Sequence, residues 1–92
     1  MAKITQTENR WEIAGDISMD NANALLIESG RLVILNTLVD FAKVTEIDTA
    51  AISLMLEWRR RAIAENQSLQ FVNLPANLQS LAQLYGVTEL IN

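Results

Sequence analysis

The side chains able to do chemistry in this sequence are carboxylates and hydroxyls, because the chain holds no cysteine and no histidine. This composition excludes disulfides, thiolate and imidazole metal sites, cysteine nucleophiles and any Ser-His-Asp triad. Histidine is also the usual general base near neutral pH. An enzyme built from this chain would therefore have to use paired carboxylates.

Four acidic residues are the candidates for such a pair, namely Asp16, Asp40, Glu46 and Asp48. Carboxylate catalysis requires two acids that converge on a cleft. Asp40 follows an apolar run and Asp48 stands at an expected helix start, so both have structural uses, and the sequence indicates no pocket. The glycines, at positions 15, 30 and 86, form no phosphate-binding loop. We therefore expect no enzymatic activity, no metal and no cofactor.

The hydroxyl of most interest belongs to Thr49, which follows Asp48 at the expected start of a helix. One interpretation is local, because Asp or Thr at an N-cap satisfies backbone N–H groups that a helix leaves unpaired. The other is functional, since a helix N-terminus favours negative charge and would tolerate a phosphate there. The local chemistry therefore permits a switch at Thr49 without requiring one.

The charge balance limits the partners of the chain. It has 11 acidic against 7 basic residues and a net charge of −4, which argues against binding to duplex nucleic acid. Three of the basic residues form the run Arg59-Arg60-Arg61, which is either a solvated helix face or a partner contact. No apolar run approaches the ~20 residues of a membrane span, and the N-terminus lacks the apolar core of a signal peptide. We therefore expect a cytoplasmic protein that does not insert into a membrane.

Apolar periodicity divides the chain into strands and helices. The expected elements are a β-hairpin over residues 4–17, a helix over 20–33, a strand over 37–41, a short connection over 43–47, a helix over 48–65, a strand over 69–73 and a helix from Pro75 to Tyr85 that Gly86 ends. Strands that alternate with helices imply crossovers and a mostly parallel sheet. We expect one α/β domain over residues 1–92, in which helices pack on a mixed sheet with an N-terminal hairpin.

Local signals mark the ends of the first elements. Glu8 and Asn9 form the expected hairpin turn. Ser18 or Asp20 can cap the first helix. Gly30 either lies inside that helix, at a cost of about 1 kcal/mol relative to alanine, or ends it. The C-terminal boundary of the first helix therefore stays open between Gly30 and residue 33.

The helix over residues 48–65 has a wide apolar surface. An ordinary core stripe is formed by Ile52, Met55, Leu56, Ala62 and Ile63. Ala51, Leu54 and Trp58 widen the apolar arc to roughly 200°, about twice what a helix on a sheet requires. Either Leu54 and Trp58 pack under a neighbouring helix, or they form an exposed strip flanked by arginines. The second interpretation predicts a protein-binding face, because Trp and Arg are enriched at interface hot spots.

The segment from Leu38 to Ile52 resembles the signature of the STAS family, which is named after sulfate transporters and anti-sigma factor antagonists. In it a strand that ends in Asp40-Phe41 is followed by a short loop and then by Asp48-Thr49-Ala50-Ala51-Ile52, which opens a helix. The order of elements agrees with the fold of that family, and the resemblance covers nearly the whole chain. It implies a STAS fold and a protein that works through contacts with other proteins.

The C-terminal part is similar to one branch of the family, the STAS subunits of Mla phospholipid transport complexes. The segments that carry this similarity are Leu56-Glu57-Trp58-Arg59-Arg60, Phe71-Val72-Asn73-Leu74-Pro75 and Leu81-Ala82-Gln83-Leu84-Tyr85-Gly86-Val87. The resemblance implies a non-enzymatic accessory subunit that binds the ATPase subunit of an ABC transporter, peripheral at the inner membrane through that complex. The alternative is an anti-sigma factor antagonist, which binds a serine-kinase anti-sigma factor and is phosphorylated at the position of Thr49.

The resemblance carries over two groups of candidate site residues. Asp48 and Thr49 occupy the phosphoacceptor position and are the expected partner contact. The neighbouring helix face adds four further partner-binding residues, namely Leu54, Trp58, Arg59 and Arg61.

Overall fold

The structure is a computed structural model that describes residues 2–91 of the 92-residue chain. The elements are β1 (Lys3–Thr7), β2 (Arg10–Ile17), α1 (Ala22–Ser29), β3 (Thr37–Ile47), α2 (Ala50–Ala64), β4 (Leu69–Val72), α3 (Ala76–Leu84) and a short 3₁₀ helix (Thr88–Leu90). Their order is the expected one. Within the described part of the chain, no helix is both long and apolar enough to span a membrane.

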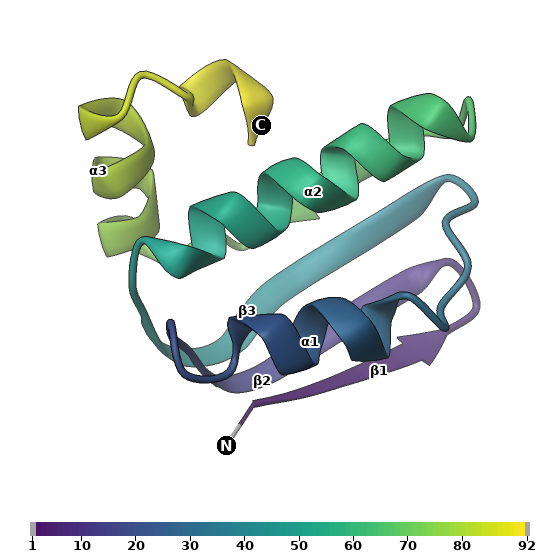
Figure 1. The fold of residues 1–92 in the computed structure, drawn as a ribbon, viewed down its shortest axis with the longest axis horizontal. Helices are drawn as coiled ribbons and strands as arrows, with labels where there is room; N and C mark the ends of the chain where they lie inside the picture. Colours follow the sequence, from purple (N-terminus) through teal and green to yellow (C-terminus); the bar gives the residue numbers. More distant parts are fainter. Residues whose placement is uncertain (1, 92) are drawn as a thin grey trace.

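The strands form one mixed sheet with the order β1-β2-β3-β4 (Figure 1). β1 and β2 pair antiparallel, whereas β2 with β3 and β3 with β4 pair parallel. The helices α1 and α2 lie side by side on one face of the sheet, and both begin at the same end of it (Figure 1). The expected α/β fold, with an N-terminal hairpin and helices packed on a mixed sheet, is therefore confirmed.

The strand β3 is longer than its sequence indicates. Residues 43–47 were expected to form a short connection, but they continue the strand as far as Ile47. The reason is β2, which pairs with this stretch through Ala14↔Lys43 and Ile17↔Ile47, although the register shifts at irregularities between Glu12 and Ala14 and between Gly15 and Asp16. Gly15 lies at one of these irregularities and has a φ of 93°, a conformation that favours glycine.

The first helix is short. It ends at Ser29, with Gly30 as its C-cap, so the shorter of the two expected boundaries is correct. The side chains of Ser18 and Asp20 do not cap it. Asn21 organises the turn instead, because its amide oxygen accepts the N–H of Ser18 at 2.9 Å and its amide nitrogen donates to the Asp16 carbonyl at 2.8 Å.

The core lies between the sheet and the two helices. Leu54 and Trp58 are 3% and 1% exposed, so the first of their two alternatives is correct: they pack in the core and form no exposed strip. Trp58 meets Trp11 of β2 edge to face, with ring centroids 5.6 Å apart and an interplanar angle of 83°. The indole N–H of Trp58 donates to the buried Ser29 hydroxyl of α1 at 2.7 Å.

Ile63 was expected in the core but lies on the surface. It was assigned to the core stripe of α2, but 71% of its surface is exposed. Figure 1 shows the reason, because α3 and the C-terminal segment flank the first half of α2 and leave its far end uncovered. After α3, Gly86 adopts a φ of 69° and reverses the chain, as expected for a helix stop.

Candidate functional site

The start of α2 is fixed by the carboxylate of Asp48. One of its oxygens accepts the backbone N–H of Ala50 at 2.8 Å, which caps the helix. The other accepts the backbone N–H of Met19 at 3.0 Å, in the loop that leads into α1. Asp48 therefore ties together the beginnings of both helices and positions Thr49, its neighbour.

Thr49 occupies an open position at this helix start. Its backbone is helical, with φ −62° and ψ −21°, and the residue is half-buried. Its side chain makes no cap hydrogen bond, and among residues 2–91 no hydrogen bond of its hydroxyl is present. Because Asp48 already caps the helix, the Thr49 hydroxyl is left available to a partner.

Thr49 lies between two hollows in the surface. The larger, which we call the α2 trough, has a volume of about 760 Å³ and is lined by Met19, Ala22, Asn23, Leu26, Thr49, Ala50, Ile52, Ser53, Leu54, Leu56, Glu57, Tyr85 and Val87. The smaller, of about 520 Å³, is lined by Ile47, Asp48, Thr49, Asn77, Ser80, Leu81 and Leu84. Neither hollow was indicated by the sequence, and Asp48 is the only one of the four candidate acids that lines either of them.

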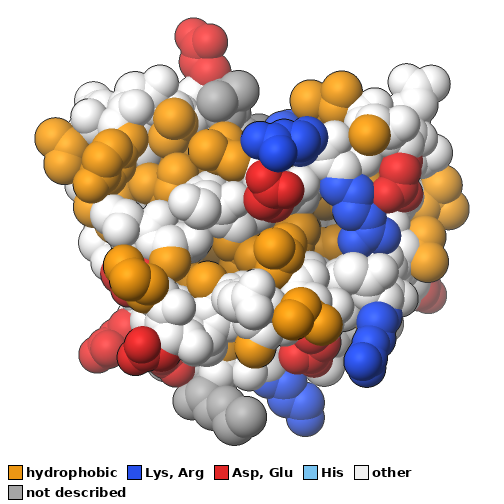
Figure 2. All heavy atoms as spheres, in the orientation of Figure 1, with side chains coloured by type: hydrophobic (Ala, Val, Ile, Leu, Met, Phe, Trp, Pro, Cys, Tyr) orange, Lys and Arg blue, Asp and Glu red, His pale blue; other side chains and the backbone are white. Residues whose placement is uncertain are grey.

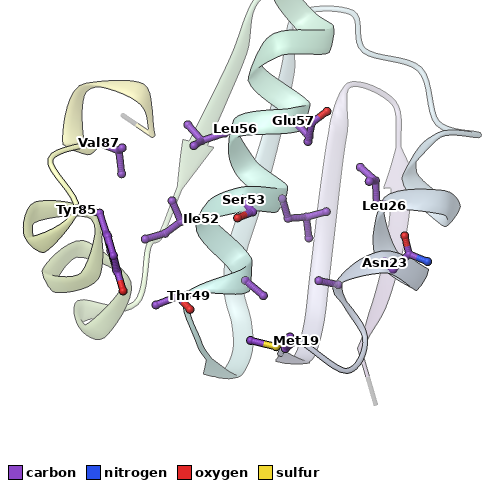
Figure 3. Close-up of a pocket in the computed structure, with 13 residues that line it drawn as sticks. Met19, Asn23, Leu26, Thr49, Ile52, Ser53, Leu56, Glu57, Tyr85 and Val87 are labelled. Carbon is purple, nitrogen blue, oxygen red and sulfur yellow. The ribbon is translucent and has the colours of Figure 1, made fainter.

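The α2 trough is open and mainly apolar. The first half of α2 forms its floor, α1 forms one wall and the segment from Tyr85 to Val87 forms the other (Figure 3). Met19 and Tyr85 are 76% and 59% exposed at its margins, and Leu84, in the smaller hollow, is 76% exposed. Figure 2 shows apolar side chains spread across this face of the molecule. Large apolar groups left in water around one polar residue are typical of a protein-binding surface.

Of the other expected partner-binding residues, Leu54 lines the α2 trough, whereas Arg59 and Arg61 line neither hollow. Arg59 donates to the backbone carbonyl of Leu69, and its guanidinium lies 5.1 Å from the ring centroid of Phe71, so it holds β4 to α2. Arg61 donates to the carbonyls of Ser29 and Leu32, where it satisfies the C-terminal end of α1. Both arginines have structural roles that the charge run alone did not reveal, and their contact with a partner stays a prediction.

Asp40, one of the four acidic residues considered above, has a structural role. Asp40 accepts hydrogen bonds from Arg10 at 2.7 Å, from the N–H of Ala42 at 2.8 Å and from Asn73 at 2.9 Å. Burial acts to raise the pKa of Asp40, but these hydrogen bonds and the Arg10 charge outweigh burial and hold the pKa below its usual value. Asp40, which lies within β3, thus links that strand to the start of β2 and to the residue that follows β4. The described residues contain no group of three or more His, Cys, Asp or Glu side chains that could hold a metal ion.

Some residues around Thr49 were missed from the sequence. Met19, Leu26 and Tyr85 come from three separate segments and converge only in the fold. A usable signal was present for Met19, which is a large apolar residue in a polar turn between a strand and a helix. For Tyr85 the sequence indicated burial, because its spacing from Leu78 and Ala82 placed it on an apolar helix stripe. Leu78 and Ala82 are indeed buried, but Tyr85 is exposed.

Comparisons with known proteins agree with the fold. A family model described as the Mlab STAS domain matches residues 2–92. No curated protein matches the chain. The structure of the anti-sigma factor antagonist SpoIIAA in its unphosphorylated form has a TM-score of 0.70 and 12% identity, over 91% of this chain and 83% of that chain. A crystal structure of Mglu has a TM-score of 0.61 and 22% identity, over 80% of this chain but 20% of the other.

Proposed function

Because the chain belongs to the Mlab STAS-domain family, we propose that it is a non-enzymatic accessory subunit of an ABC transporter for intermembrane phospholipid transport. It binds the cytoplasmic ATPase subunit of that transporter and supports its activity. The observation that carries the proposal is Thr49, a half-buried residue with an unbonded hydroxyl among the described residues, set between two apolar hollows. The protein acts in the cytoplasm, at the inner membrane, through its complex with the ATPase.

The contact surface in this proposal is centred on Thr49. Three exposed apolar side chains surround it, with Met19 at 76%, Leu84 at 76% and Tyr85 at 59% exposure. Burying such side chains against a partner is favourable at about 25 cal/mol per Å² of apolar surface. Asp48 contributes to this surface by positioning Thr49 and the Met19 loop.

A charge placed on Thr49 tests this surface. Thr49→Glu should leave the fold intact, because a helix N-terminus favours negative charge, but its longer side chain should block close approach of the ATPase at this position and weaken the complex. The matched control is Thr45→Glu, at an exposed threonine on β3 that lines neither hollow. Each variant is co-expressed with a tagged ATPase subunit from a phospholipid ABC transporter, and the complex is measured by co-purification and ATP hydrolysis.

The expected result is a folded Thr49→Glu protein, judged by circular dichroism, with reduced ATPase binding, beside a Thr45→Glu protein that binds normally. If the native chain does not bind the ATPase at all, the proposed function is wrong. If it binds and Thr49→Glu binds equally well, the partner contacts another surface.

A second candidate function is that of an anti-sigma factor antagonist regulated by phosphorylation. The accessible Thr49 hydroxyl at the start of α2 favours it, since phosphate at a helix N-terminus is electrostatically favourable. The similarity in fold to an anti-sigma factor antagonist also supports it. Incubation with a serine-kinase anti-sigma factor and ATP, followed by mass spectrometry, tests this function. Phosphate on Thr49 together with a stable complex would favour it, and the absence of both would exclude it.

A further inference from the structure

The α2 trough has the shape of a groove that could bind one more helix. Its floor runs along α2 from Thr49 to Glu57, about 12 Å at the α-helical rise, which matches two to three turns of a helix. The side chains that rise from its two walls include Leu26 and Tyr85, which are 37% and 59% exposed (Figure 3). Between them the floor is low at Ser53, a small exposed residue.

The backbone of the trough selects a helix over an extended peptide. An added strand needs a row of unpaired N–H and C=O groups, as at the edge of a sheet. The floor is the interior of α2 and one wall is α1, whose backbone groups are paired within each helix. An extended segment would leave its own backbone unpaired on this apolar surface, whereas a helix brings its backbone bonds with it.

The charges around the trough favour a partner helix that has basic residues at one end. The lining contains no lysine or arginine, and its one charged member, Glu57, is paired with Arg60 at 2.8 Å. At the Thr49 end lie Asp48, whose carboxylate accepts backbone N–H groups, and the exposed Asp20. Neither acid has an ion pair within residues 2–91. In Figure 2 the basic side chains lie on the opposite half of this face, toward the C-terminal end of α2.

The helix dipoles set the direction. Both α1 and α2 begin at the Thr49 end, so their positive N-terminal ends lie there together (Figure 1). A helix that ends at the same place brings its negative C-terminal carbonyls to them, and basic residues are favourable in its last turn. We propose that the α2 trough binds an amphipathic helix of the ATPase, antiparallel to α2, with Lys or Arg in its last turn beside Asp20 and Asp48. The identity of the partner, though not the chemistry of the helix, rests on the function proposed above.

A synthetic peptide tests the trough without the ATPase. The probe is an amphipathic peptide of leucine, alanine and lysine, about 18 residues long, because shorter isolated helices are marginal in water. One version carries its lysines in the last turn, and a second version of the same composition carries them in the first turn. Each is titrated into the isotope-labelled full chain, and amide shifts are followed by NMR. A spin label on the C-terminus of the peptide reports its direction.

The expected result is that shifts concentrate at Met19, Leu26, Ser53 and Tyr85, and that the spin label broadens Thr49. The peptide with C-terminal lysines should bind about threefold more tightly, as the dipole and the acidic end together favour it. Equal affinity of the two peptides, or broadening at Glu57 in place of Thr49, would overturn the proposed direction and charge. Shifts confined to another surface would overturn the trough as the binding site.

A pair of variants on one helix links the trough to the ATPase. Ser53→Arg fills the floor with a large cation, whereas Ala64→Arg adds the same side chain at an exposed position at the far end of α2. Ser53→Arg should weaken binding of both the peptide and the ATPase by about tenfold or more, and Ala64→Arg should change neither. If the ATPase binds and Ser53→Arg leaves the complex unchanged, the trough proposal fails while the proposed function stands. If the peptide binds in the trough and the ATPase does not bind, the proposed function fails, while the α2 trough remains a helix-binding site.

Discussion

The hydrogen bond from Trp58 to Ser29 joins two helices inside the core, and a double-mutant cycle can measure its energy. The indole N–H donates to the Ser29 hydroxyl at 2.7 Å, and both residues are at most 1% exposed. The Ser29 hydroxyl in turn donates to the carbonyl of Leu26 at 2.9 Å. The variants are Trp58→Phe, Ser29→Ala and the double variant, which removes both polar partners.

The magnitudes follow from what each substitution leaves unpaired. Ser29→Ala leaves the buried indole N–H of Trp58 without an acceptor, which should lower the free energy of unfolding by about 1–3 kcal/mol. Trp58→Phe loses the bond and part of the ring volume, at about 2 kcal/mol, while the ring keeps its contact with Trp11. The double variant leaves no donor without an acceptor, so its cost should fall short of the sum by about 1–2 kcal/mol.

The assay is urea denaturation followed by far-ultraviolet circular dichroism, since tryptophan fluorescence changes with the substitution itself. A chain of 92 residues has a stability of roughly 5–14 kcal/mol, so each variant should stay folded enough for a two-state fit. The control cycle pairs Trp58→Phe with Ser80→Ala, on the exposed side of α3, and should be additive. If the Ser29 cycle is also additive within about 0.5 kcal/mol, the bond contributes nothing and the reasoning is refuted.

Two further predictions concern charged groups that hold strands and helices together. Asp40 has a lowered pKa, so its charged form stabilises the fold above the unfolded-state value of about 3.9, and this contribution is lost as the pH falls through the lower folded value. The stability gap between the native chain and Asp40→Asn should therefore be widest at neutral pH and narrow below about pH 4 in urea melts, and a gap independent of pH would contradict this role. Arg61→Met should cost about 1–2 kcal/mol and speed amide hydrogen exchange across α1, because it removes the bonds to Ser29 and Leu32. The neighbouring Arg60→Met, at a side chain that is 76% exposed, should stay within about 0.5 kcal/mol of the native chain, and equal effects of the two substitutions would refute the assignment.

The elements that could be predicted from the sequence are those whose signals are local. The turn at Glu8 and Asn9, the helix stop at Gly86 and the cap at the start of α2 each depend on a few neighbouring residues, and all are present. The position of Thr49 at a helix start follows in the same way. Its open hydroxyl could not be predicted, because either Asp48 or Thr49 could cap the helix, and only the structure assigns the cap to Asp48.

The incorrect predictions concern residues whose structure depends on contact with a second or third element. The end of β3 reads as a connection because residues 43–47 are largely polar, and only pairing with β2 makes them a strand. Leu54 and Trp58 look excessive on a helix that faces a sheet alone, but α1 gives that helix a second neighbour. Ile63 continues the apolar stripe, yet it is exposed, because α3 and the C-terminal segment do not reach that end of α2. Helical periodicity shows which residues share one face of a helix, but it does not show how many of its faces other elements cover.

The candidate site shows the same division. Asp48 and Thr49 are adjacent in sequence and could be predicted together. The trough depends on Met19, Leu26 and Tyr85, which the chain brings together from three separate segments. Their exposure could not be inferred, because an apolar residue with helical spacing is more often buried than left in water.

The order β1-β2-β3-β4 in the sheet is also the order of the strands along the chain, and this has a consequence for how the protein folds. A growing chain can form the β1–β2 hairpin on a microsecond timescale, and each later strand then joins the edge that the previous one has just completed. No strand has to be inserted between two that are already paired. The strands can therefore pair in chain order without undoing any earlier contact, and β3 is the edge opposite β1 until β4 pairs with it.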